Sequence, residues 1–96
     1  MIVHIVLFKL KEPSDENIAT VREMLLSMNG KIPMLRHLEA GIDVIRSERS
    51  YDVALYTKFD NLADLQAYQV HPYHADTVIP CMKANCSSIV AADYEI

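Results

Sequence analysis

The chain contains no tryptophan, only two glycines and only two cysteines among its 96 residues. Its nine lysine and arginine residues are scattered, so no basic block is present. Nucleic-acid binding is therefore disfavoured, because neutralising a phosphate backbone requires clustered cations. The sequence also has nothing that resembles a glycine-rich phosphate loop, a Ser-His-Asp set or a pair of haem ligands. The sequence therefore gives no support for a phosphate-loop protein, a Ser-His-Asp hydrolase or a haem protein.

No apolar stretch is long enough to cross a membrane. The longest one opens the chain and is interrupted by His4 and Lys9, whereas a spanning helix needs about 20 mostly apolar residues. The start also lacks the basic region and the small-residue cleavage site of a secretory signal. We expect a soluble protein located in the cytoplasm.

The two cysteines, Cys81 and Cys86, fit free thiols in a reducing compartment. Their proximity to His71 and His74 also allows a zinc site, but four residues separate the cysteines, which is wider than a tight metal knuckle. We therefore expect both thiols to be free and predict neither a metal nor a cofactor.

The composition is that of one globular domain covering residues 1–96, with 51% hydrophobic residues, 23% charged residues and a net charge of −4. A chain of this size buries only about 60–65% of the surface that its unfolded form exposes. Such a domain is marginally stable alone and gains stability by oligomerising.

Hydrophobic periodicity predicts a β-α-β-β-α-β order. Ser14 is a good helix cap, and Asn29-Gly30 is a typical helix end. Asp60 is expected to cap the second long helix, and Pro80 to limit or kink a short third one. The expected strands cover residues 2–10, 35–45, 51–59 and 87–96, and the short helix covers 75–83. This order predicts an α+β, ferredoxin-like sandwich with a four-stranded antiparallel sheet and helices on one face.

The first and third expected strands are apolar on both faces. Alternation along residues 2–10 places His4, Val6 and Phe8 on one face and Ile5 and Leu7 on the other. The helices can cover only one face of the sheet. A second copy of the chain is the simplest cover for the other face, so we predict a homodimer.

The segment from Tyr68 to His74 gathers two tyrosines and two histidines around Pro72, which stiffens the corner. Histidine titrates near neutral pH and is therefore a candidate acid or base. The alternative is structural: His71 or His74 caps the end of the preceding helix, and Tyr68 is its last core contact.

His4 lies among aliphatic neighbours, where an unpaired polar ring costs a few kcal/mol. It therefore needs a partner, and the acids on neighbouring strands that can serve are Asp52, Asp93 and Glu95. A satisfied core histidine remains an alternative to a site residue.

Several stretches of this chain resemble the stress-responsive α/β-barrel (Dabb) proteins. They are the opening Met-Ile-Val-His-Ile-Val-Leu-Phe-Lys-Leu, Tyr51-Asp52-Val53-Ala54-Leu55, Phe59-Asp60, the stretch from Leu65 to His74 and the closing Asp93-Tyr94-Glu95-Ile96. The similarity runs in order along essentially the whole chain. Its most specific element is the Tyr-Gln-Val-His-Pro-Tyr-His run that ends at His74.

The resemblance implies a dimeric α+β barrel, in agreement with the two-faced strands. Within this family, olivetolic acid cyclase closes a polyketide by an aldol step, and its catalytic positions match Tyr68, His74 and His4 of this chain. Other relatives resemble stable stress-induced oligomers without chemistry, and the motif occurs in both kinds.

Two functions are therefore predicted. The favoured one is a homodimer with an apolar cavity that binds a small apolar or carbonyl-containing molecule, without a catalytic role. The alternative is a cyclase-like or isomerase-like enzyme that uses Tyr68 and His74 as an acid/base pair, with His4 nearby. A haem-degrading monooxygenase with His71 or His74 as axial ligand is disfavoured by the family resemblance.

Overall fold

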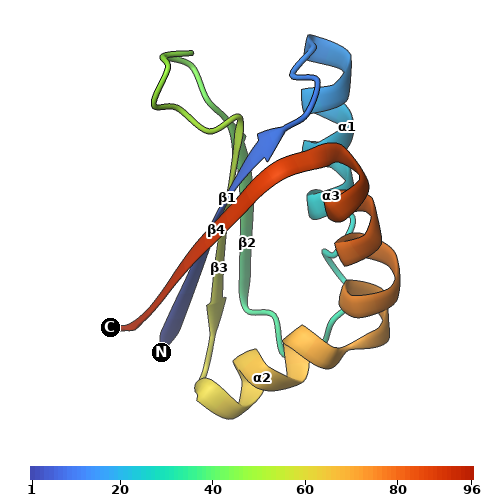
Figure 1. Ribbon diagram of the computed structural model, residues 1–96. Helices are drawn as coiled ribbons and strands as arrows, with labels where there is room; N and C mark the ends of the chain where they lie inside the picture. Colours follow the sequence, from blue (N-terminus) through green and yellow to red (C-terminus); the bar gives the residue numbers. More distant parts are fainter.

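The computed structural model describes all residues from Met1 to Ile96. A four-stranded antiparallel sheet in the order β2-β3-β1-β4 carries every helix on one face (Figure 1). This arrangement is a ferredoxin-like α+β fold, as predicted. The elements are β1 (Ile2–Leu10), α1 (Asp15–Leu26), β2 (His37–Ile42), β3 (Val53–Phe59), α2 (Leu62–Val70), the π-helix η1 (Tyr73–Val78), α3 (Ile79–Asn85) and β4 (Cys86–Glu95).

Strand β1 lies at the centre of the sheet because it pairs with both β3 and β4. Its β-branched and aromatic residues favour the extended conformation. Val6 and Phe8 belong to the buried core beneath the helices, and His4 shares their face. The register places His4 directly opposite Asp93 of the edge strand β4. The predicted alternation of β1 is therefore confirmed.

Helix α1 begins where the sequence predicted. The Ser14 hydroxyl accepts a hydrogen bond from the Asn17 amide at 3.1 Å, and acidic residues occupy the first turn. The helix ends at Leu26, before the predicted stop at Asn29-Gly30. The amides of Met28 and Asn29 bond to carbonyls three residues back, so the last turn tightens early. Gly30 then takes the positive φ of 79° that turns the chain.

Strand β2 covers Leu38, Ala40 and Ile42 but not the whole of the predicted residues 35–45. The register pairs Ile42 with Val53, the first residue of β3, so the chain beyond Ile42 has no partner strand. Val44 is 86% exposed in the loop that follows. The alternation of apolar residues continues past the place where the sheet ends.

The cap of α2 is Asn61, so the prediction of Asp60 was wrong. The Asn61 side chain accepts from the Asp64 amide at 2.9 Å. The Asp60 carboxylate instead forms an ion pair with Arg36, whose Nε lies 3.1 Å from it.

The helical segment after Pro72 is longer than the predicted helix over 75–83. It starts with the π-helix η1 and continues into α3, which ends at Asn85. Pro80 occupies the first turn of α3. Proline has no amide, so Pro80 interrupts the backbone hydrogen bonds that run from α3 back into η1, such as the one from the Ile79 amide to the His74 carbonyl.

One face of the sheet carries no helix (Figure 1), and the residues at its centre are apolar. The register sets Ile5 beside Tyr56 and Ala92, and Leu7 beside Ala54 and Val90. Val90 is 43% exposed and Tyr94 46% exposed. The predicted second apolar face is therefore present and uncovered in the single chain. None of the helices is long and apolar enough to cross a membrane.

Candidate functional site

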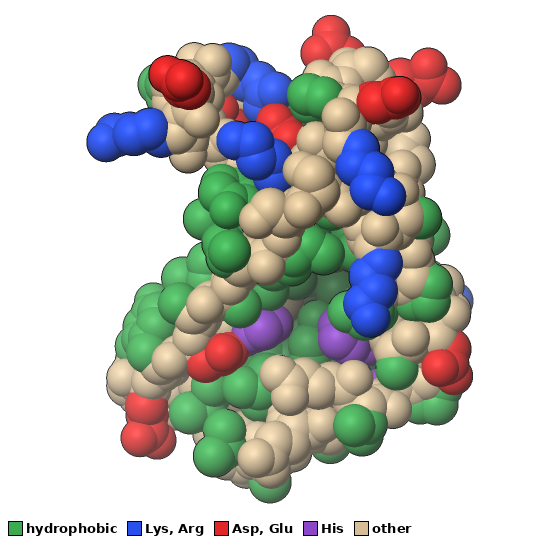
Figure 2. Space-filling view, in the orientation of Figure 1, with side chains coloured by type: hydrophobic (Ala, Val, Ile, Leu, Met, Phe, Trp, Pro, Cys, Tyr) green, Lys and Arg blue, Asp and Glu red, His purple; other side chains and the backbone are tan.

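A cavity of about 340 Å³ lies between the sheet and the helices. Ten of its 14 lining residues are hydrophobic, and they come from β1, β3, β4, η1 and all three α-helices. Figure 2 shows the opening as a hollow in which two histidine side chains are visible. The other four lining residues are His4, Gln69, His74 and Lys83, and Tyr68 adds a phenol hydroxyl to the hydrophobic group. Such a cavity suits a small, mostly apolar molecule with one or two polar groups.

His4 reaches the cavity from β1 and is only 7% exposed. Its Nδ1 donates a hydrogen bond to the Asp93 carboxylate of β4. Asp93, one of the three acids expected as the partner of His4, is therefore confirmed. The register between β1 and β4 sets the two residues opposite each other. Because an ionised carboxylate can only accept, the Nδ1 atom carries a proton. The Nε2 atom has no hydrogen-bond partner in the protein.

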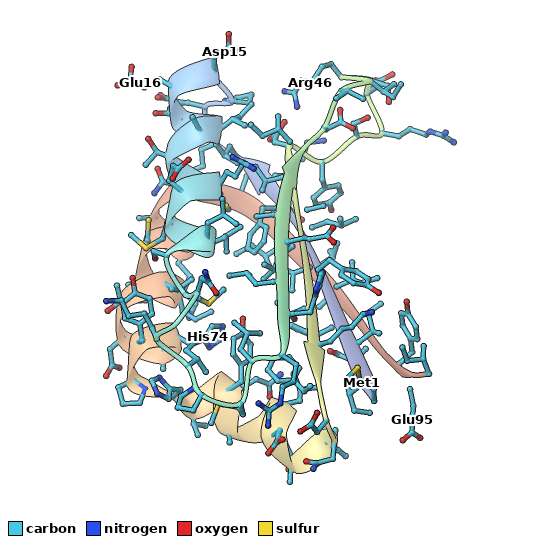
Figure 3. All side chains as sticks on the ribbon, turned by 180° about the vertical axis from the view of Figure 1, so that it is seen from behind. Met1, Asp15, Glu16, Arg46, His74 and Glu95 are labelled. Atoms are coloured by element: carbon cyan, nitrogen blue, oxygen red, sulfur yellow. The ribbon has the colours of Figure 1, made fainter.

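His74 reaches the cavity from η1, and its Nδ1 donates to the Gln69 carbonyl at 3.1 Å. That carbonyl lies at the end of α2. Its usual donor, the Tyr73 amide, bonds instead to the His71 ring at 3.2 Å. The capping alternative is therefore confirmed for His74, and the ring lines the cavity as well. In Figure 3 the labelled His74 side chain lies in the space between the helices and the sheet.

The capping bond fixes the tautomer of His74. A carbonyl oxygen can only accept, so Nδ1 carries the proton and the neutral ring has its lone pair on Nε2. Burial lowers the pKa of His74 below 6.5, and the charges of His4 and His71 lower it further, against the opposing effect of the Gln69 bond. The ring is therefore an unprotonated base at neutral pH.

The Tyr68 ring lies close to both imidazoles. Its ring centroid is 4.2 Å from that of His74, 5.9 Å from that of His4 and 4.9 Å from that of Phe59. The residue is fully buried, and its hydroxyl donates only a weak bond to the Met28 sulfur at 3.7 Å. Burial also raises the pKa of this phenol, so it stays neutral and acts as a donor.

The structure brings together the three predicted site residues His4, Tyr68 and His74, and all three line one cavity. It leaves His71 outside the cavity wall. Sequence reasoning missed Gln69 and Lys83 as lining residues. Both are polar residues, and only the folded arrangement places them at the cavity.

Both cysteines are free thiols: Cys81 is half-buried and Cys86 buried. Burial raises the pKa of Cys86, and the neighbouring Cys81 and Asp52 raise it further against the effect of Lys11. No three His, Cys, Asp or Glu side chains in the chain are grouped as metal ligands.

The model of the stress-responsive A/B barrel domain (Dabb) matches residues 2–96 of this chain. The chain belongs to this family. A stress-response A/B barrel domain-containing protein of Arabidopsis thaliana is 27% identical over 95 residues, which are 98% of this chain but only 36% of the plant protein. The chain thus spans about a third of that relative's length.

Two solved structures place the Dabb fold in context. A dimeric protein of unknown function with a ferredoxin-like fold from Bacteroides fragilis is 32% identical, has a TM-score of 0.83, and matches over 99% of this chain and 95% of its own. The hydroxynitrile lyase of Passiflora edulis is 19% identical, with a TM-score of 0.78 over 99% of this chain and 92% of its own. At this identity the second similarity shows the fold alone.

Proposed function

We propose that this Dabb protein is a homodimer whose subunits each bind a small, mostly apolar molecule in the cavity beneath the sheet. The observation that carries the proposal is the pair of imidazoles in an otherwise apolar wall. His4 and His74 each have Nδ1 engaged by the protein, so each can present Nε2 to a ligand. A hydroxyl or amide N–H group on an apolar body can donate to the unprotonated Nε2 of His74.

The apolar lining supplies the affinity in this proposal. Val6, Phe8 and Leu55 from the sheet face Val78 and Met82 from the helices. Removing apolar ligand surface from water contributes about 25 cal/mol per Å² before the cost of association is subtracted. Polar groups then fix the orientation of the ligand more than its affinity. We expect weak selectivity for ligand length and stronger selectivity for the position of an oxygen atom.

The homodimer part of the proposal rests on the uncovered face around Ile5 and Leu7 and on the dimeric Bacteroides fragilis relative. A second copy that laid its own sheet against this face would remove that apolar surface from water. The cavity lies on the opposite face of the sheet, so dimer formation leaves its lining unchanged.

A blocked cavity tests the binding proposal. Ala91 lines the cavity from β4, so Ala91→Phe should fill part of it. Ala63→Phe places the same ring on an exposed position of α2, away from the cavity wall. In calorimetric titration with octanamide, the parent and Ala63→Phe should bind, and Ala91→Phe should bind at least about tenfold more weakly, a loss of about 1.4 kcal/mol. Equal binding by all three proteins would contradict the proposal.

A second candidate function is acid–base catalysis on such a ligand by Tyr68 and His74. The specific support is the fixed tautomer of His74, which places an unprotonated nitrogen in the cavity wall at neutral pH. His74 would remove a proton next to a carbonyl group. The Tyr68 hydroxyl would donate to the enolate oxygen. The hydroxynitrile lyase of Passiflora edulis is an enzyme with the same fold, and a fold alone assigns no reaction.

A further inference from the structure

Lys83 is the one lining residue of the cavity with a permanent charge. The other 13 lining residues contain no Asp, Glu or Arg and no second Lys. Lys83 is exposed and also belongs to the cavity wall, so it lies at the edge of the cavity. Figure 2 shows a Lys or Arg side chain at the rim of the hollow, close to a histidine. A cation at the edge of an apolar cavity attracts anionic ligands and so favours them over neutral ones.

The Lys83 ammonium has no partner in the protein. It takes part in none of the ion pairs of the structure. It also lies over no aromatic ring, unlike Lys9, Lys31 and Lys58. Its position in the last turn of α3 gives it one internal role, a favourable interaction with the helix dipole. That role orients the charge only loosely and leaves its hydrogen-bond donors free.

We propose that the ligand of this cavity is an amphipathic monocarboxylate, with its apolar body inside and its carboxylate at the opening against Lys83. This inference rests on the binding function proposed above. A single ammonium balances a single carboxylate charge. A phosphate carries about −1.5 to −2 charges and needs several donors, which the mostly hydrophobic wall does not supply.

The charges around the cavity agree with this assignment. Asp93 is the acid bonded to a lining residue, and its carboxylate is already engaged by His4. The His74 ring is neutral at neutral pH, because burial lowers its pKa, so it adds no positive charge to the cavity there. The chain as a whole has a net charge of −4, so its overall field does not attract anions. Preference for an anion must therefore come from Lys83 itself.

Paired probes that differ in charge alone test the inference. Octanoate and octanamide have the same apolar body, and only the first is an anion at neutral pH. Titration at low salt should show that the parent binds octanoate about fivefold more tightly than octanamide, as expected for an exposed ion pair. Lys83→Met should lose this preference and keep its affinity for octanamide. Lys83→Arg should retain it.

Lys11→Met is the matched control. Lys11 is also exposed and forms no ion pair, but it lies outside the cavity wall. It should keep the preference for octanoate. Equal binding of both probes by the parent, or an equal loss of preference in both methionine variants, would overturn the assignment to Lys83. Failure of the parent to bind either probe would instead overturn the binding function as well.

Discussion

At the scale of single residues, the contact with the largest consequence is the bond from His74 Nδ1 to the Gln69 carbonyl. The same bond satisfies the end of α2 and fixes which nitrogen of the ring is free. The structural and functional interpretations of His74 are therefore compatible. Tyr68 differs from His74, because its hydroxyl bonds only to the Met28 sulfur. A thioether is a weak acceptor, so this bond contributes little to the stability of the fold.

The catalytic candidate leads to a pH prediction for His74. A base must be unprotonated, and the pKa of His74 is lowered below 6.5 by burial. In heavy water, the parent should exchange the protons next to the carbonyl group of acetophenone. In each exchange the C–H bond breaks, its electron pair moves toward the carbonyl oxygen, the proton passes to Nε2 and a solvent deuteron replaces it. The rate should rise with pH and level off above a midpoint below 6.5.

His74→Gln should abolish this exchange, and Tyr68→Phe should slow it if the phenol donates to the enolate oxygen. His37→Gln, which changes a histidine outside the cavity, should leave the rate unchanged. A midpoint above 6.5, or full exchange by His74→Gln, would contradict the assigned role. A parent protein without exchange would remove the catalytic candidate and leave the binding proposal standing.

At the scale of elements, the sequence predicted the order of the elements and most strand faces, because periodicity in β1 and α1 reflects burial directly. It failed where the outcome depends on a partner elsewhere in the chain. Asp60 and Asn61 are equally good caps in isolation, but in the structure Asn61 bonds to the Asp64 amide and Asp60 pairs with Arg36. The π-helix η1 has no periodic signature of its own, yet it sets the direction of His74.

The candidate site was partly predictable for the same reason. His4, Tyr68 and His74 stood out as polar rings in or beside apolar segments. The acid that pairs with His4 could be narrowed to three residues, but selecting Asp93 requires the register between β1 and β4. Lys83 gave no signal, because an exposed lysine near the end of a helix is ordinary until a cavity opens beside it.

At the scale of the whole molecule, the apolar face without helices predicts the assembly state. Sedimentation at micromolar concentration should give a dimer, because the exposed face around Leu7 gains by being covered. Leu7→Lys places a charge at the centre of that face and should give a monomer, since burying an unpaired charge is costly. Ala63→Lys, on an exposed helix position, should remain dimeric. If the parent stays monomeric, the claim that the apolar face without helices drives dimer formation is wrong.

The central claim is that a ligand enters the cavity and meets two imidazoles. The four histidines of the chain allow a direct measurement, since two line the cavity and two do not. Proton NMR of the imidazole rings, recorded while octanamide is added, should show saturable shifts at His4 and His74. The rings of His37 and His71 serve as internal controls and should change much less. Shifts at no histidine, or mainly at His37 and His71, would contradict the account.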